Sequence, residues 1–145
     1  MKARTESSKR IRLIYNIKAG EVKKRIALFK ARSSRKKGHI AFMGKRLRLY
    51  HFGARERKDR SVTVRVRKDE GRKPLGPRYF IAPFKAGGSE NMGVFYRKTK
   101  SRLPIAQAYT VGVAEMFEKE AQDTVEDMIR RDSADTFRHQ LRFYL

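Results

Sequence analysis

The sequence contains no cysteine, which excludes disulfide bonds and zinc sites built on thiolates. It also lacks any apolar run near the ~20 residues that a membrane-spanning helix needs. The opening residues MKARTESSKR are charged and no apolar stretch follows them, so no secretory signal peptide is predicted. These absences favour a protein that works in a reducing environment or inside an assembly, without a membrane.

Acidic residues are scarce, since 15 Asp and Glu stand against 37 Lys and Arg, a net charge of +22. This excess goes beyond what solubility requires of a small domain, and it predicts a polyanion or an acidic protein surface as partner. Hydrophobic residues still make up 39% of the chain, with nine Phe and six Tyr. That is too apolar for a disordered basic tail, and 145 residues predict a single domain, 1–145.

The charge is unevenly distributed along the chain. Residues 1–102 hold 32 basic and 7 acidic side chains, a net charge of +25, whereas residues 103–145 hold 5 and 8, a net charge of −3. The basic clusters alternate with apolar residues, which is typical of the solvent face of ordered elements. We therefore expect the two parts to have different roles.

Residue types that carry catalysis are few and scattered. The three histidines, His39, His51 and His139, lie far apart without zinc-ligand spacing. A metal-dependent nuclease would have to bring together Asp59, Asp69 and Glu70, the candidate carboxylates around the strand at Val62. No Gly-rich phosphate loop or nucleophile elbow occurs either. The sequence thus predicts a protein that is no enzyme and has no cofactor, no metal and no catalytic residue.

Hydrophobic periodicity predicts an α+β fold. It has N-terminal helical segments within residues 1–30, an antiparallel sheet of about five to six short strands within 31–97, and a C-terminal helical region over 104–145. Within Thr5 to Tyr15, the residues Ile11, Ile14 and Tyr15 fall on one helical face, which predicts the end of a first helix. A second helix is predicted from about Lys18, with Asn16 as its N-terminal cap.

The first strands are predicted around a basic turn at residues 33–38. Ile26 to Phe29 and Ile40 to Met43 flank this turn, and the alternation of Leu47, Leu49 and His51 predicts a further strand that folds back on Ile40 to Met43 as a hairpin. The segment Ser61–Arg67 predicts a strand with Val62, Val64 and Val66 facing inward. Its outward side chains would be Thr63, Arg65 and Arg67.

The remaining elements follow from proline, glycine and a change of period. Tyr79 to Phe84 predicts a strand that Pro83 restricts to a sheet edge, followed by a flexible loop over 85–92 and a strand at 93–97. From Val111 onward the period becomes helical. It predicts one long helix of ~30 residues, about 45 Å if unbroken, with Asp132-Ser133 as the candidate interruption.

Several spaced segments resemble the lambda-type phage minor tail protein Z family, also called tail completion proteins. The resemblance runs from about residue 3 to the C-terminus. It departs from the family in two places: members usually have a further long helix before Ala3, and Gly-Pro-Ser in place of Thr110-Val111-Gly112. The segments that carry it are Arg12 to Lys24 with Tyr15-Asn-Ile-Lys-Ala-Gly20, Phe52-Gly-Ala-Arg55, Val62 to Arg67, Gly93-Val-Phe95 with Arg97, and Arg102-Leu-Pro-Ile105 leading through Tyr109 to Val113 and Met116-Phe117.

This resemblance implies a structural protein at the head-proximal end of the virion tail, assembled in the host cytoplasm. It would act in tail assembly, head–tail joining and positioning of the genome end, without catalysis. The implied partners are a tail terminator, the tail tube, a head–tail connector and further copies of the chain in a ring. Genomic double-stranded DNA is a further candidate. A basic nucleic-acid-binding module, such as a ribosome-associated protein, remains the alternative.

Three groups of residues are the candidate contact sites. Arg65 and Arg67 would form a cationic stripe for DNA or a partner, and a basic run would meet phosphate unless it is simply solvated. That run is Arg97, Lys98, Lys100 and Arg102. The segment Leu103, Pro104 and Ile105, with Tyr109, is a candidate docking element, although proline also occurs where turns and helices begin. Aromatic residues such as Phe80 and Phe84 predict core packing better than base stacking.

Overall fold

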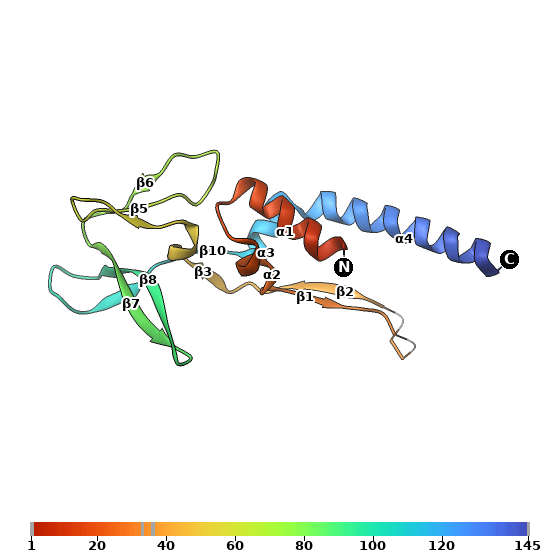
Figure 1. The fold of residues 1–145 in the computed structure, drawn as a ribbon, viewed down its shortest axis with the longest axis horizontal. Coiled ribbons are helices and arrows are strands. Elements are labelled where there is room, and N and C mark those ends of the chain that lie inside the picture. Colours follow the sequence, from red (N-terminus) through yellow and green to blue (C-terminus); the bar gives the residue numbers. More distant parts are fainter. Residues whose placement is uncertain (1, 33, 36, 145) are drawn as a thin grey trace.

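The computed structural model describes residues 2–32, 34–35 and 37–144. These residues form an α+β fold with an N-terminal helix, small antiparallel sheets and a long C-terminal helix (Figure 1). The helices are α1 (Lys2–Ile14), α2 (Ala19–Lys23), η1 (Leu49–Phe52, a 3-10 turn), α3 (Val113–Glu120) and α4 (Gln122–Tyr144). The strands are β1 (Ile26–Phe29), β2 (His39–Phe42), β3 (Arg46–Arg48), β4 (Arg55–Glu56), β5 (Val62–Val64), β6 (Lys73–Pro74), β7 (Tyr79–Ala86), β8 (Ser89–Arg97), β9 (Ile105–Gln107) and β10 (Tyr109–Gly112).

The N-terminal helix α1 confirms the first predicted helix, with Ile11 fully buried. The second helix, α2, is short and begins after Lys18, which provides no side-chain cap. The predicted cap at Asn16 is wrong. The N-cap position of α2 is Lys18, two residues later, and the amide of Asn16 instead donates to the backbone carbonyls of Phe52 (3.3 Å) and Arg65 (3.1 Å).

The hairpin predicted between Ile40 to Met43 and Leu47 to His51 is wrong. β2 pairs with β1, in a register that sets Ile26 opposite Phe42, and β3 pairs with β10. Gly44 separates β2 from β3, and its carbonyl oxygen would lie 2.7 Å from a Cβ on Gly112. This close approach of two backbones requires glycine at position 112. It allows β3 to lie beside β10.

The sheet region consists of separate small sheets and not of one continuous sheet. One has the order β4-β5-β6 and another β7-β8-β9. The predicted strand Ser61–Arg67 is regular only over Val62–Val64, and Thr63 is buried, not outward-facing. Because β5 is the central strand of its sheet and is covered on both faces, alternation of polar and apolar residues is not required there.

The β7–β8 hairpin is longer than predicted. Its register runs from Tyr79 opposite Tyr96 to Ala86 opposite Ser89. Residues 85–92, predicted as a flexible loop, are therefore mostly strand. Gly87 and Gly88 alone make the turn, with φ of 59° and 77°, values that suit a tight hairpin turn. β7 lies at the edge of its sheet, which confirms the position inferred from Pro83.

The long C-terminal helix starts later than predicted and is interrupted elsewhere. Residues 105–112 form β9 and β10, so the predicted helical region 104–145 is wrong at its start. The break falls at Ala121 (φ −133°), whereas Asp132-Ser133 lies inside α4. α4 has 23 residues, about 34 Å, and projects from the body in Figure 1.

Two clusters of buried side chains form the core. A helical cluster includes Ile11, Phe52 and Met116, and a sheet cluster includes Val62 and Val94. Val66 packs against both clusters. Among the described residues, no helix combines the length and apolar content needed to cross a membrane.

Candidate functional site

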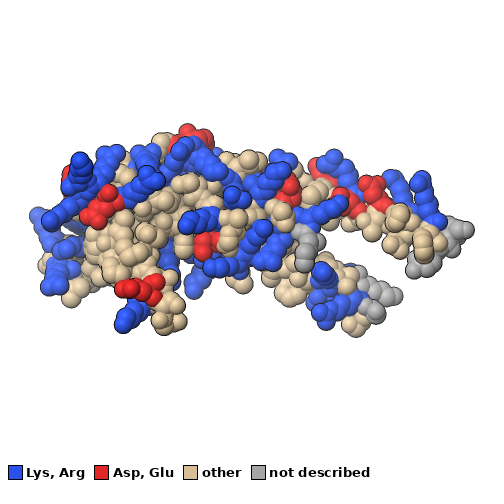
Figure 2. All heavy atoms as spheres, in the orientation of Figure 1, with Lys and Arg blue, Asp and Glu red and all other residues tan. Residues whose placement is uncertain are grey.

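Basic side chains are spread over the whole surface in view, and they outnumber the acidic ones (Figure 2). Lys and Arg spread over the body and along the projecting β1–β2 hairpin, with a few acidic side chains between them. Carboxylates are more frequent along α4, where they are interleaved with Arg. The uneven distribution of charge along the sequence therefore corresponds to an uneven distribution over the surface.

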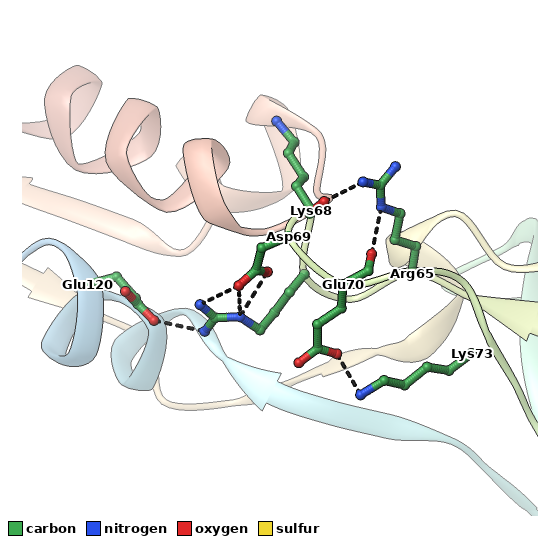
Figure 3. Close-up of polar contacts among 7 residues, drawn as sticks. Arg65, Lys68, Asp69, Glu70, Lys73 and Glu120 are labelled. Atoms are coloured by element: carbon green, nitrogen blue, oxygen red, sulfur yellow. Dashed lines mark hydrogen bonds and ion pairs between the residues drawn. The ribbon is translucent and has the colours of Figure 1, made fainter.

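Arg67 lies at the centre of an ion-pair cluster and is not a freely outward-facing cation. Its guanidinium donates to Asp69 (3.1 Å) and to Glu120 at the end of α3 (2.9 Å) (Figure 3). It also lies 5.5 Å from the ring centroid of Tyr15. The predicted outward orientation fails here because the chain after β5 lies against α3, which supplies Glu120, and against Tyr15, which follows α1.

The pKa values in this cluster follow from its contacts. The hydrogen bond from Arg67 holds the pKa of Asp69 below its usual value, and the hydrogen bonds to Asp69 and Glu120 raise that of Arg67. Burial raises the pKa of Tyr15, and the charge of Glu120 acts in the same direction. Arg67 thus remains charged and joins the loop after β5 to the helices.

Arg65 is exposed, but its guanidinium is also engaged by the same loop. It donates to the carbonyl oxygens of Lys68 and Glu70, as Figure 3 shows. The backbone amide of Lys68 donates to the carbonyl of Ile14 (2.7 Å) at the end of α1. Both arginines of the predicted stripe therefore contribute to loop structure, which leaves less of their hydrogen-bonding capacity for a partner.

The carboxylates considered for nuclease chemistry each have a local partner. Asp59 accepts hydrogen bonds from the backbone amide and hydroxyl of Ser61, and Glu70 pairs with Lys73 at 2.6 Å. Asp69 pairs with Arg67, as described above. Within the described ranges, no group of three or more His, Asp or Glu side chains is placed to hold a metal ion.

The predicted basic run lies at the end of β8 and in the connection to β9. Arg97 and Lys100 line a groove of about 560 Å³ together with Arg60 and Arg78, residues that the sequence did not connect with them. The Arg97 guanidinium lies 5.6 Å from the ring centroid of Phe80. Lys98 and Arg102 are also exposed. The structure therefore combines part of the predicted run with two further arginines and an aromatic ring.

The predicted docking segment closes the same β8–β9 connection. The backbone amide of Lys98 donates to the carbonyl of Pro104 (3.1 Å), and Ile105 pairs with Arg97 across the sheet. Leu103 is 67% exposed and the Leu103–Pro104 peptide bond is cis. Tyr109 lies in a different sheet, opposite Arg48, so the four docking residues do not form one patch.

An apolar groove of about 580 Å³ was not anticipated from the sequence. It lies between the β1–β2 hairpin and α4, where Figure 2 shows a hollow, and its lining includes Leu28, Ile40, Phe117 and Ile129. The rings of Phe42 and Phe117, both of which also line the groove, stack with their centroids 3.8 Å apart. The pairing of β1 with β2, which creates this groove, is a tertiary feature that local periodicity indicates only in part.

The apolar face of α4 continues beyond this groove. Val125 is buried, whereas Ile129, Phe137 and Leu141 are exposed by 37%, 65% and 42%. Their spacing in multiples of four residues makes them neighbours along a stripe that turns gradually around the helix, because 3.6 residues complete one turn. In comparisons with known proteins, no family model, curated protein or solved structure matches this chain.

Proposed function

We propose that this protein is a structural subunit of a phage tail that acts as a tail completion protein at the head-proximal end. Its role is in tail assembly, head–tail joining and positioning of the genome end, and it performs no catalysis. The observation that carries the proposal is the projecting helix α4, because its exposed apolar side chains support the burial of this surface in an assembly.

A second copy of the chain is the partner that fits this face. Each molecule carries both an amphipathic helix and an apolar groove at the base of that helix. A helix that packs into the groove of the next copy makes a head-to-tail contact, and such contacts close into rings when the rotation permits. Tail terminator, tail tube and head–tail connector proteins are the further partners.

The positive charge supports a position beside DNA. Residues 1–102 carry a net charge of +25, and a ring of such subunits would surround the leading end of the genome with Lys and Arg. Contacts to phosphate position DNA without reading its sequence, which is the requirement at a tail entrance. The virion tail is therefore the location that we propose.

The alternative is a basic nucleic-acid-binding module that acts as a single copy, such as a ribosome-associated protein. The groove that contains Arg60, Arg78, Arg97 and Lys100 favours this second function, because four cations from separate parts of the chain line it beside a single carboxylate, Glu56. The two functions differ in self-association, which the first requires and the second does not.

The test is the oligomeric state of the purified protein by size-exclusion chromatography with light scattering, with cryo-electron microscopy of any ring. Wild-type protein is expected to form a discrete oligomer. Phe137→Ser combined with Leu141→Ser is expected to yield a folded monomer, since both side chains are exposed in one molecule. The control, His139→Ser with Arg142→Ser on another side of α4, is expected to remain oligomeric. A wild-type monomer at all concentrations would overturn the proposal.

A further inference from the structure

A second basic groove, of about 460 Å³, lies on the opposite side of β3 from its buried Leu47. It forms where α2, the segment around β3, the β7–β8 hairpin and β10 meet. Its lining is Glu21, Lys24, Arg25, Met43, Lys45, Arg46, Arg48, His51, Asn91 and Tyr109. None of these residues except Tyr109 belonged to a predicted contact site, because α2, β3 and β8 bring them together from distant parts of the sequence.

Positive charge exceeds negative charge in this groove. Five Lys and Arg side chains line it, and Glu21 is the one carboxylate among the lining residues. Glu21 is already engaged, because its carboxylate lies 3.0 Å from Arg25, 3.4 Å from Lys24 and 3.6 Å from His51. Among the described residues, no carboxylate forms an ion pair with Lys45, Arg46 or Arg48. The groove therefore has uncompensated positive charge at its opening.

The pKa values of Glu21 and His51 reflect this surplus of positive charge. Burial alone would raise the pKa of Glu21, but the hydrogen bond from Arg25, with the charges of His51 and Lys24, outweighs burial and lowers it. Burial lowers the pKa of His51, and Arg25, Arg48 and Lys24 add to this effect against the charge of Glu21. His51 is thus a neutral hydrogen-bonding group at neutral pH.

Two of the cations, Arg25 and Arg48, are held in place by contacts within the protein. Arg46 and Arg48 flank the buried Leu47 on β3, so their side chains share the other side of the strand. Arg48 lies 4.7 Å from the ring centroid of Phe84, and Arg25 is fixed by two hydrogen bonds to Glu21. Arranged donors lose less conformational entropy on binding than freely mobile side chains.

We propose that this groove binds the phosphodiester backbone of nucleic acid, with Lys45, Arg46 and Arg48 contacting successive phosphates. The amide of Asn91 donates one hydrogen to the carbonyl of Ser89 and has a second one to offer beside them, whereas the hydroxyl of Tyr109 donates to Gln107. A polymer fits better than a single phosphate because the cations are spread along an open groove, with Lys24 and Arg25 after α2 and the other three along β3 and just before it. The inference rests on the proposed function only for the identification of this polymer as the genomic DNA.

Fluorescence anisotropy with a labelled random-sequence DNA duplex tests the proposal. Lys45→Gln combined with Arg46→Gln removes two exposed cations without an ion-pair partner. We expect at least about tenfold weaker binding near 0.1 M salt, and a slope of log affinity against log salt that is smaller by about 2. The matched control, Lys9→Gln with Arg12→Gln on α1, removes the same charge from exposed positions and should weaken binding by less than about twofold.

Three outcomes would overturn the inference. The first is that both double variants weaken binding equally, which would indicate diffuse electrostatic attraction. The second is that the wild-type protein shows no detectable binding of DNA. The third is that it binds polyglutamate as tightly as DNA, which would indicate an acidic protein partner. Light scattering on the same samples separates this inference from the proposed function. A monomeric protein that binds DNA through the groove would leave the inference standing and overturn the tail-subunit proposal.

Discussion

Arg67 connects three parts of the chain through one side chain. It bonds Asp69 beside it, Glu120 at the end of α3, and the ring of Tyr15 just after α1. Glu120 retains 21% of its side-chain exposure, so it is poorly placed to recover solvation if its partner is removed. Arg67 therefore has a structural role that its position in a basic cluster does not indicate.

Replacing Arg67 with Met should lower the urea midpoint of unfolding more than replacing Arg65 with Met, because Arg65 bonds only to carbonyls of its own loop. Circular dichroism during urea titration measures the difference. The costs of Arg67→Met and Glu120→Gln should be less than additive in the double variant, since they remove one shared contact. Arg12→Met is the control for charge. Fully additive costs would show that the contact contributes nothing.

Sequence reasoning at the residue scale succeeded for core positions and failed for polar ones. Ile11, Val62 and Val64 are buried as their periodicity predicted. Asn16 and Thr63 were assigned from local rules for helix caps and strand faces. Their actual environments depend on segments 36 or more residues away for Asn16 and on a second covering layer for Thr63. Local patterns do not contain this information.

At the scale of elements, the contact between β2 and α3 holds the hairpin to the helices. The rings of Phe42 and Phe117 stack there, at the edge of the helical cluster. Phe117→Asp would place a carboxylate in this contact and remove the stacked ring. Its effect should therefore extend to the hairpin as well as to α3.

We expect Phe117→Asp to destabilise the protein by about 3 kcal/mol or more, from lost apolar contacts and from a charge placed in apolar surroundings. Thermal unfolding followed by circular dichroism provides the measurement. Leu13→Asp on α1 is the matched control, because Leu13 is 59% exposed, and it should cost much less. Similar melting temperatures for the two variants would mean that Phe117 does not pack against β2 as described.

Most helices and strands could be predicted from the sequence, but the pairing of the strands could not. The first helix, the β1 and β2 strands and the edge position of β7 were confirmed. The assignment of β3 to β2 was wrong because nearness in sequence favoured a hairpin, whereas the glycines at 44 and 112 permit the closer β3–β10 approach. The strands at 105–112 were missed because they are short and directly precede a strong helical period.

At the scale of the whole molecule, the dominant feature is the net charge of +22, because positive side chains far outnumber negative ones. Charges of one sign on a compact surface repel one another, and salt reduces that repulsion. The ion pairs of the chain, such as Arg67 with Glu120, are weakened by salt as well, but they are few compared with the unpaired cations.

The melting temperature should therefore rise between about 50 and about 500 mM NaCl. Differential scanning fluorimetry or calorimetry at a series of salt concentrations tests this, with KCl as the control for ion identity. The affinity for DNA should change in the opposite direction over the same range. A melting temperature that falls with salt would mean that ion pairs contribute more to stability than repulsion costs.

The candidate surfaces were predictable in character but not in location. Composition indicated cationic surfaces, and Arg97 with Lys100 do line a basic groove. The groove around Arg46 and Arg48 depends on the meeting of four elements, and the apolar groove depends on the β1–β2 pairing. Such surfaces arise from tertiary packing, which one sequence without relatives indicates only weakly.

The amide of Leu49 donates to the carbonyl of Ala108 at 3.0 Å, so residues 49–108 leave and rejoin the rest of the protein at a single point. This segment can therefore be regarded as an insert carried on the β3–β10 stem, and changes of its length far from that stem cost little loop entropy. Phe52 and Val66 are the apolar side chains that the insert contributes to the helical cluster, and Arg67 joins the insert to α3 through its ion pair with Glu120. A chimaera that exchanged this insert would have to preserve these two apolar side chains and the Arg67 ion pair.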